Sequence, residues 1–547
     1  MSMSKSKSGS MSGPPWCARG RAAVGALVAL LAAAACGRAP DEPVAPAAPA
    51  ASVAPVAPAA PDEAPIVVPR LWDTAAIAGW ATPLAGLGQP ATMLPEELYY
   101  AAPVDNLATY PVYHPSREPK GYRESLIAKG PRRIIEPERL KTRADWVEAG
   151  RVVFESLDTP LSRSDDPEVI AHFTSAEAVD ATRDATHDVV SADGILLDYR
   201  WVVMPDGKLK LSLSSCFGCH TRLMPDGSVL LGAPSNYNLS ETPAVTKMLD
   251  QLDTLPEMTL GEKIYAQFGV PWRENDPHAA WRTMPPDELL PVLDADSGEP
   301  EGTMFARYNG SPLYGTRMAD LRGIRDRRWL DATGTHRNRG PEDVARYGIL
   351  VEYAPEPIFG SHQMLPESTL KYLVRPPDEA MYALGLFLYS LDPAPSPYPF
   401  DDAARRGQQI FEEEGCVKCH TPPAYTNNKL VAAPGFDPPP DDPRVLAGEI
   451  ISRRVYTDPG LALATRKGTG CYKIPSLRGV WYRGLYGHSG FETSLEAWFD
   501  PARQRADHVP SGWRGPGVKT LAVPGHDFGL DLPPEDKTAL IAFLRTL

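Results

Sequence analysis

The sequence has no excess of basic residues and no apolar run long enough to span a membrane. Lys and Arg total 55 against 69 Asp and Glu, which gives a formal net charge of −14. This charge argues against nucleic acid and against an anionic membrane surface as partners. The apolar run at residues 22–35 is too short to cross a bilayer. With 547 residues, 43% of them hydrophobic, the chain is expected to be mostly globular, with two to four domains.

Cysteine and histidine are also scarce, with 7 and 11 copies, so the places where they gather are informative. The pattern C-x-x-C-H is the attachment site of c-type haem. Two thiols one helical turn apart form thioethers with the two vinyl groups of the porphyrin, and the next histidine binds the iron as its proximal ligand. The chain has two copies, which together predict two covalently bound haem c groups: Cys216-Phe-Gly-Cys219-His220 and Cys416-Val-Lys-Cys419-His420.

Other uses of these cysteines fit less well. A zinc ribbon has two C-x-x-C knuckles roughly 15–20 residues apart, whereas Cys216 and Cys416 are 200 positions apart. A thioredoxin-like pair accounts for C-x-x-C but not for a histidine directly after it in both copies. Cys471 lies outside the motifs and is expected to be a small buried side chain.

The N-terminus is typical of an exported bacterial protein. Residues 1–35 are expected to form a signal peptide, because basic residues precede the apolar run. Ala33-Ala34-Ala35 suits ordinary cleavage, while Cys36-Gly37 suits a lipoprotein with an acylated cysteine, and we favour the second route. Residues 36–69 follow as an extended Ala/Pro-rich linker. Since bacteria attach haem c outside the cytoplasm, we expect a periplasmic or outer-membrane-anchored protein, tethered through lipidated Cys36.

The segments that precede the two motifs resemble each other. The dipeptide Asp401-Asp402 is expected to cap a helix that carries Gly407 and Phe411. Gly150 and Phe154 repeat this Gly-x-x-x-Phe spacing ahead of the first motif. A closing helix with the pattern Leu-x-x-Phe-Leu-x-Ser/Thr-Leu then follows each motif. This order of matching segments indicates an internal duplication.

An opening helix, a haem loop and a closing helix that packs back on the first is the plan of a cytochrome c domain. We therefore predict a mainly α fold with two cytochrome c-like haem domains, at residues 70–391 and 392–547. The first is expected to be elaborated with long loops over residues 235–375, including a helical stretch at 244–252. Short β-hairpins are expected at Asp206-Gly207 and Asp226-Gly227.

No methionine follows Met381, so the second haem cannot take a methionine ligand from its own domain. The histidines available there are His488, His508 and His526. His526 follows a glycine in a turn-like segment and is the candidate ligand opposite His420. His488 is expected in a haem pocket, and His508 is expected to be an ordinary surface residue.

The sixth ligand of the first iron stays open at this point. A five-coordinate iron, accessible to peroxide or dioxygen, is an equal alternative to a protein ligand. The candidate ligands are Met224, Met248, Met258, His278, His336, His362 and Met364.

Three further segments carry a resemblance to a known family. They are Tyr472-Lys473-Ile474-Pro475-Ser476-Leu477-Arg478-Gly479-Val480, Tyr486-Gly487-His488-Ser489-Gly490 and Thr493-Ser494-Leu495-Glu496. Together with the two haem motifs they resemble the bacterial di-haem cytochrome c peroxidase superfamily. That superfamily includes the enzyme that matures the quinone cofactor of methylamine dehydrogenase and, more distantly, the latex-cleaving rubber oxygenases. The resemblance covers residues 140–547 and is strongest from residue 376 onward.

The resemblance implies two electronically connected haems, one that relays electrons and one that reacts. It implies that His488 lies in the pocket of the reactive N-terminal haem, as a catalytic acid/base, and that Arg478 lies near a haem propionate. The chain departs from the peroxidases at position 502, where it has Ala502 in place of their methionine ligand. Its widely spaced motifs are more similar to the rubber oxygenases, which have a bis-histidine second haem and a dioxygen-binding first haem.

The sequence thus favours an exported di-haem oxidoreductase, peroxidase-like or oxygenase-like, in which one haem reacts with peroxide or dioxygen and the other relays electrons. Its partner would be a redox protein or a small electron donor. The alternative is a non-catalytic electron-transfer cytochrome with both irons six-coordinate. A third reading is a lipoprotein subunit that connects a partner dehydrogenase to the respiratory chain.

Overall fold

The computed structural model describes residues 66–177, 179, 190–213, 215–236, 258–293, 295, 298, 304–305, 310–352, 356–365 and 373–547. These residues belong to one compact unit, Glu63–Leu547. The predicted signal peptide, Cys36, nearly all of the 36–69 linker and the stretch at 244–252 lie outside the described residues. Among the helices described, none combines the length and apolar character that a bilayer crossing requires.

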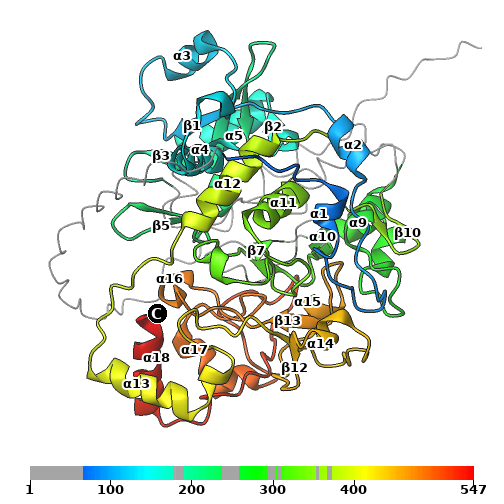
Figure 1. Ribbon diagram of the computed structural model, residues 1–547, viewed down its shortest axis with the longest axis vertical. Coiled ribbons are helices and arrows are strands. Elements are labelled where there is room, and N and C mark those ends of the chain that lie inside the picture. The colour runs from blue at the N-terminus through cyan, green and yellow to red at the C-terminus, as the bar shows by residue number, and fades with distance from the viewer. Residues whose placement is uncertain are drawn as a thin grey trace, which may run out of the picture. The chain divides into compact units, whose positions relative to one another are not determined.

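Two pairs of packed helices organise the described chain (Figure 1). In the first pair, α4 (Arg143–Ser156) packs on α12 (Asp378–Ser390). In the second pair, α13 (Asp402–Glu413) packs on α18 (Pro534–Arg545). The first C-x-x-C-H motif lies between α4 and α12 in sequence, and the second lies between α13 and α18. Each motif therefore has an opening and a closing helix, as the sequence predicts.

Local sequence explains where the two opening helices begin. Thr142 accepts a hydrogen bond from the backbone of Asp145, and the Asp145 carboxylate accepts one in return from Thr142, which is a complete capping box for α4. The Asp401 carboxylate accepts from the backbone N–H of Ala404 and caps α13, as predicted.

A glycine allows close backbone contact within each helix pair. A Cβ atom added to Gly150 would lie 1.9 Å from the carbonyl oxygen of Ala383, and one added to Gly407 would lie 1.9 Å from that of Ala539. Both distances are far below van der Waals contact, so any side chain larger than hydrogen would separate the helices. The glycine of each Gly-x-x-x-Phe pattern is thus the crossing point of its helix pair.

The phenylalanine of each pattern packs one turn further along. The rings of Phe154 and Phe387 have centroids 5.6 Å apart, and those of Phe411 and Phe543 are 5.4 Å apart, with interplanar angles of 52° and 62°. These are favourable separations for tilted aromatic pairs. The two helix pairs are built alike, in agreement with the repeat that the sequence pattern indicates.

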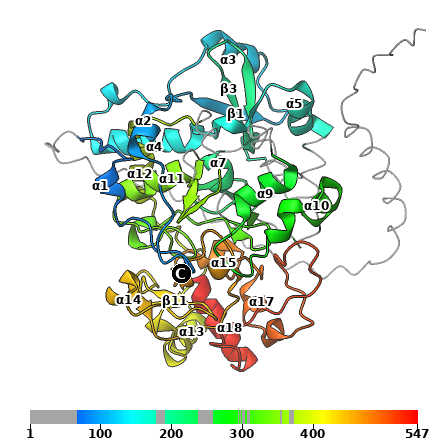
Figure 2. The ribbon, with the colours of Figure 1, turned by 90° about the vertical axis from the view of Figure 1, so that its right-hand side faces the viewer.

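The chain around the first motif also contains β-structure. An antiparallel sheet has the strand order β1-β3-β4-β2, with β1 at Thr109–Tyr113, β3 at Ile195–Val203, β4 at Leu209–Ser212 and β2 at Arg163–Ser164. The turn at Asp206-Gly207 joins β3 to β4, as predicted, and almost all of β3 is buried. Figure 2 shows α3 and α5 beside this sheet.

A second hairpin follows the motif directly. Strands β5 (Thr221–Leu223) and β6 (Val229–Leu231) pair across the predicted turn at Asp226-Gly227. Of the residues that the structure describes, 35% are helical and 13% are in strands. The expectation of a mainly α fold is therefore corrected to a mixed one, because the segment inserted around the first motif forms a buried sheet in addition to hairpins.

A small sheet in the C-terminal region approaches the second motif. It contains β11 (Leu430–Ala432), β12 (Ile450–Ile451) and β13 (Cys471–Lys473) in the order β12-β11-β13. Cys471 is fully buried in this sheet, as predicted. The other helices and strands are α1 (Thr74–Ile77), α2 (Glu96–Ala101), α3 (Tyr122–Lys129), α5 (Pro167–Thr174), α7 (Cys216–Cys219), α9 (Leu260–Phe268), α10 (Pro286–Leu293), β7 (Met304–Phe305), β8 (Thr316–Arg317), α11 (Pro341–Glu352), β9 (Ile358–Phe359), β10 (His362–Gln363), α14 (Pro443–Leu446), α15 (Gly460–Leu463), α16 (Val480–Arg483) and α17 (Leu495–Trp498).

Candidate functional site

The first C-x-x-C-H motif forms a single helical turn at the edge of a cavity. The two cysteines are the ends of α7, and Ser215 caps this turn by accepting from the backbone N–H of Gly218 at 3.0 Å. A cavity of about 210 Å³, the first cavity, is lined by Cys216, Cys219 and His220. The turn presents both thiols and the imidazole to the same space, as covalent haem attachment requires.

One nitrogen of His220 is held by the backbone. Its Nδ1 lies 2.9 Å from the carbonyl oxygen of Ala319. A carbonyl only accepts, so Nδ1 is the donor and Nε2 carries the lone pair that a metal would bind. A backbone partner of this kind is typical of a metal-binding histidine, because it fixes the tautomer and the ring orientation.

The second motif borders a cavity of its own. A cavity of about 230 Å³, the second cavity, is lined by Cys416, Cys419 and His420. His420 Nδ1 lies 3.1 Å from the carbonyl oxygen of Pro475 and 3.2 Å from that of Tyr425, which again leaves Nε2 as the lone-pair nitrogen. Burial lowers the pKa of His420 to about 4, so the imidazole is neutral at physiological pH, the form that binds a metal.

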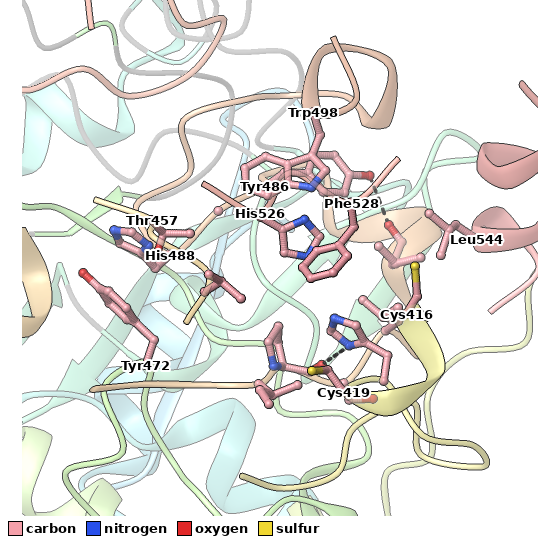
Figure 3. Close-up of a pocket in the computed structure, with 18 of the residues that line it drawn as sticks. Cys416, Cys419, Thr457, Tyr472, Tyr486, His488, Trp498, His526, Phe528 and Leu544 are labelled. Atoms are coloured by element: carbon pink, nitrogen blue, oxygen red, sulfur yellow. Dashed lines mark hydrogen bonds between the residues drawn. The ribbon is translucent and has the colours of Figure 1, made fainter. Parts of the chain in front are cut away.

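His526 faces His420 within the second cavity. Figure 3 shows the His526 ring directed into the space bordered by Cys416 and Cys419. The ring centroids of His420 and His526 are 6.4 Å apart. Two metal–imidazole bonds of about 2.0–2.1 Å each, with a ring radius of about 1.2 Å, place the centres of two trans imidazoles roughly 6–6.5 Å apart. The observed separation suits one metal ion between the two rings.

The backbone that carries His526 is strained and firmly held. His526 has a φ of 50°, a left-handed conformation that residues other than glycine adopt rarely. Its N–H donates to the carbonyl oxygen of Val455 at 2.7 Å. A Cβ atom at Gly525 would lie 2.2 Å from that same oxygen, so only glycine fits there. Because the chain passes this close to Val455, the backbone conformation of the turn at Gly525 and His526 is fixed.

Arg503 fixes the same turn from within. Its guanidinium is fully buried and donates to the carbonyl oxygens of Gly525 at 2.8 Å and His526 at 3.1 Å, and also to that of Val523. It lies over the ring of Trp498, which in turn packs against His526 with centroids 5.6 Å apart. Arg503 was not identified from the sequence. Its hydrogen bonds offset the cost of the strained turn.

His488 lies in the second cavity. Its ring stacks on Tyr472 at 4.1 Å, and Nε2 lies 3.6 Å from Asp458 Oδ1, buried and without a hydrogen-bond partner. Figure 3 shows His488 beside Tyr472, away from His526. The first cavity is lined by other residues. The resemblance implies the pocket of the N-terminal haem for His488, whereas the structure has this residue at the cavity of the second motif.

Arg478 is also in a different place from the one expected. Its side chain is 35% exposed, lies 3.6 Å from Asp326 and lines neither cavity. Arg483, five positions later, lines both cavities. The guanidinium of Arg483 is turned inward by hydrogen bonds of 2.7 Å to the carbonyl oxygens of Ser476 and Arg478 itself. Of these two arginines, Arg483 is thus the one that borders the cavities of the two motifs.

The two cavities share one wall. Six residues line both cavities: Arg317, Ala332, Lys473, Pro475, Ser476 and Arg483. We call this set the shared wall. It includes Pro475, whose carbonyl oxygen holds His420. Groups bound at the two motifs would therefore be separated by a single layer of side chains.

The shared wall carries three basic side chains, and one of them, Lys473, donates to the carbonyl oxygens of Trp329 at 3.2 Å and Leu330 at 3.3 Å. Burial lowers the pKa of Arg317 to about 10 and that of Lys473 to about 7. The Arg317 guanidinium makes no hydrogen bond or ion pair with any described residue. Asp320 lies 3.8 Å from Arg483 and 3.6 Å from Arg327, another cation of the first cavity. Buried charges without partners are costly, so anions are expected in the cavities.

A haem supplies anions of this kind. Each haem carries two propionates, and guanidinium groups are well suited to bind carboxylates. The donor set at each motif, two thiols and an imidazole, and the cations of the shared wall fit two haem c groups with their propionates toward the wall. Arg317, Arg483 and Lys473 are the residues that would hold those propionates.

The first cavity is lined by none of the described methionines and histidines proposed as its sixth ligand. His278 is fully buried between Asp276 at 2.9 Å and Ser311 at 2.6 Å, and Met248 lies outside the described residues. Met318 does line the cavity, next to the Ala319 carbonyl that holds His220. One face of α11 also lines it, with the residues Val344, Tyr347, Gly348, Val351 and Glu352.

Comparison with known proteins adds little to this geometry. No family profile and no curated protein matches the chain. Among solved structures, hydrazine synthase from Kuenenia stuttgartiensis matches with a TM-score of 0.27 and 14% identity, over 52% of this chain and 86% of that one. A MauG-like protein associated with microbial copper homeostasis matches with a TM-score of 0.26 and 16% identity, over 42% and 75%. The di-haem peroxidase BthA from Burkholderia thailandensis matches with a TM-score of 0.25 and 16% identity, over 48% and 77%. These likenesses are too weak to decide the fold or the activity.

Proposed function

We propose that the chain is an exported di-haem c-type cytochrome oxidoreductase. The observation that carries this proposal is that each C-x-x-C-H motif borders its own cavity, with a wall that carries basic side chains between the two. Haem 1 would be held by Cys216, Cys219 and His220 in the first cavity. Haem 2 would be held in the second cavity by the ligands of the second motif: Cys416, Cys419 and His420.

Haem 2 is proposed to relay electrons. His526 would be its second axial ligand, because its ring centre lies 6.4 Å from that of His420 and its backbone is clamped in place. Two imidazole ligands leave no position for a substrate, so this iron would exchange electrons only. The shared wall makes the path between the haems short.

Haem 1 is proposed to react with peroxide or dioxygen. Apart from Met318, the described side chains that line the first cavity offer no methionine or histidine besides His220. Because Met318 adjoins the carbonyl that holds His220, we assign it to the proximal side. A bound haem supplies an iron with one open coordination position. The chain itself supplies polar groups on the α11 face of the first cavity, namely Tyr347 and Glu352.

His488 keeps a proposed role near haem 2 in place of catalysis at haem 1. It is buried against Tyr472 and lines the second cavity, where its unpartnered Nε2 would be one of the polar groups around haem 2.

Export is a separate part of the proposal. It rests on the signal-like residues 1–35, the acylatable Cys36 and the extracytoplasmic attachment of haem c. Metabolic labelling with a radioactive or alkyne-tagged fatty acid should mark the wild-type protein and not a Cys36→Ala variant. Label in neither protein would leave ordinary cleavage after Ala35 as the route. The electron donor is proposed to be a redox protein or a small donor of the same compartment.

The haems and their ligation are tested on the purified protein. Pyridine haemochrome analysis should give two haems per chain, both retained after extraction with acidic organic solvent. Electron paramagnetic resonance of the ferric protein should show one high-spin and one low-spin haem. Two low-spin signals, with no reaction toward peroxide or dioxygen, would overturn the enzyme proposal in favour of an electron carrier.

A further inference from the structure

A lysine and a tyrosine form a hydrogen-bonded pair on the wall of the first cavity. The ammonium group of Lys467 donates to the hydroxyl oxygen of Tyr347 at 3.1 Å. Both residues line the first cavity, and neither lines the second. Tyr347 comes from the face of α11, and Lys467 from the loop after α15. Neither residue belongs to a sequence motif.

The loop that carries Lys467 is held in position. The adjacent Arg466 is 1% exposed, and its guanidinium donates to the carbonyl oxygens of Gly269 at 2.8 Å and Tyr265 at 3.1 Å. The carbonyl oxygen of Gly468 accepts from the backbone of Ala85 at 2.8 Å. These hydrogen bonds fix the backbone on both sides of Lys467. Its side chain therefore starts from a defined position, and the pair with Tyr347 is preorganised.

A group of buried titratable residues lies behind the pair. Burial alone would raise the pKa of Asp331, but contacts with His336, Lys467 and Thr335 outweigh it and lower the pKa. His336 Nδ1 lies 3.6 Å from Asp331 Oδ2, and His336 Nε2 lies 3.7 Å from Glu356 Oε1. Burial raises the pKa of Glu356, which favours its protonated form. The His336 ring also packs against Tyr347, with centroids 5.4 Å apart.

We propose that Tyr347 and Lys467 are the hydrogen-bonding and proton-donating pair at the open face of haem 1, which rests on the function proposed above. The ligand class is a small oxygen compound, with hydrogen peroxide the substrate that this chemistry fits best. Reduction of H2O2 breaks the O–O bond and uses two electrons, from the external donor through the haems, and two protons to give two water molecules. Lys467 and Tyr347 would donate to the departing oxygen, and Glu356, whose burial favours the protonated form, would resupply protons by way of His336.

The position of His220 indicates which side of the first cavity is the open one. His220 is held through Ala319, so the segment around residue 319 is proximal. The face of α11 lines the same cavity, and α11 does not include the segment around residue 319. Among the described residues of the first cavity, Lys473 and Arg317 belong to the shared wall and are assigned to the propionates. The pair of Tyr347 and Lys467 is thus the hydrogen-bonded donor pair of this face, which also carries the carboxylate of Glu352.

Fluoride binding to the ferric holoprotein tests the pair without turnover. Fluoride binds high-spin ferric haem and depends on hydrogen-bond donors beside the iron. We expect Lys467→Met to weaken fluoride binding at haem 1 about tenfold or more, and Tyr347→Phe to weaken it by a smaller factor. Lys467→Arg, which keeps a donor, should restore most of the affinity. The second-order rate constant with peroxide should fall roughly 100-fold in Lys467→Met.

Matched controls separate this role from a structural one. Tyr389→Phe removes a hydroxyl that bonds to Asn338 outside both cavities, and Lys429→Met removes an ammonium that bonds to the carbonyl of Gly448. Both should keep wild-type fluoride affinity. Haem content and thermal melting are measured for every variant, and Lys467→Arg serves if Lys467→Met does not fold.

Two results would overturn the inference. Fluoride affinity within twofold of wild type in both Lys467→Met and Tyr347→Phe would remove the pair from the open face. A phenolate-to-iron charge-transfer band in the wild type that disappears in Tyr347→Phe would make Tyr347 an iron ligand instead. Loss of the high-spin signal from the wild type itself would be a different failure, because it would refute the proposed function rather than the pair.

Discussion

Arg503 donates a hydrogen bond to the carbonyl oxygen of His526 at 3.1 Å, and so holds the residue whose ring faces His420. The same guanidinium holds Gly525 and Val523. It therefore fixes the backbone of the turn from which the His526 ring faces His420. A histidine held this way would bind the iron without the additional entropic cost of ordering its own loop.

Removal of the His526 imidazole should open haem 2. In His526→Ala, we expect the low-spin ferric signal of haem 2 to become high-spin, and added imidazole to restore it, because the cavity then lacks its second axial ligand. Electron paramagnetic resonance at low temperature measures this. His508→Ala is the matched control, since His508 pairs with Glu492 at 2.7 Å and does not line the cavity. A low-spin haem 2 in His526→Ala would exclude His526 as the ligand.

Loss of the clamp should loosen the same ligand without removing it. In Arg503→Met the turn loses several hydrogen bonds from a charged donor, each worth about 1.5–3 kcal/mol. We expect carbon monoxide to bind ferrous haem 2 at least about tenfold faster, because His526 leaves the iron more often. Flash photolysis or stopped flow gives the rate. The control Arg505→Met breaks an exposed pair with Asp507 and should have no effect; equal rates in both variants would contradict the positioning role.

A cation in the shared wall should affect both haems. Lys473 lines both cavities, so Lys473→Met is expected to lower both reduction potentials, on the order of 50 mV each, because a positive charge stabilises the ferrous form. Spectroelectrochemical titration measures the two potentials. Lys429→Met, at a lysine outside the cavities, is the control. A shift confined to one haem would show that the wall serves only that haem.

Lys473 should also make the two reduction potentials depend on pH. Burial lowers the pKa of Lys473 to about 7, and nearby propionates would raise it again. Lys473 is charged below its pKa and neutral above it, so both potentials should fall as the pH rises through a value at or above 7. In Lys473→Met this step should be missing. A wild type and a variant with parallel pH profiles would rule out Lys473 as the titrating group.

The helix crossings should be intolerant of a single methyl group. In Gly407→Ala the added Cβ would lie 1.9 Å from the carbonyl oxygen of Ala539, so the helices must separate. Overpacking of this kind costs about 1–3 kcal/mol or more of unfolding free energy. Urea denaturation followed by circular dichroism measures it. Ala403→Ser, at an exposed position of the same helix, should stay within about 0.5 kcal/mol of wild type; a similar loss in both would argue against the close contact.

Local patterns of the sequence predict the parts of this fold that depend on local chemistry. The two Gly-x-x-x-Phe repeats predict both helix pairs, because the glycine of each repeat allows the close contact at which its two helices cross. Asp401 predicts the start of α13, and the two Asp-Gly dipeptides predict their turns. The burial of almost all of β3 is less visible, since Asp198 and Arg200 lie on one of its faces and charged residues are usually exposed.

The site depends on residues far apart in the chain, and there the sequence was less informative. Arg317 and Arg483 meet in one wall although 166 positions separate them, and no local pattern marks either one. Lys467 and Tyr347 come together in the same way. His488 belongs to a recognisable run, yet the run alone does not say which of two cavities it enters. The pairing of His526 with His420 was predicted because only three histidines follow the second motif.

The shared wall has a consequence for assembly. Because the same cations border both cavities, attachment of the first porphyrin neutralises part of the charge that the second would otherwise meet. Haem attachment at one motif should therefore affect haem attachment at the other. A chain with haem at only one motif should retain unbalanced positive charge in the shared wall.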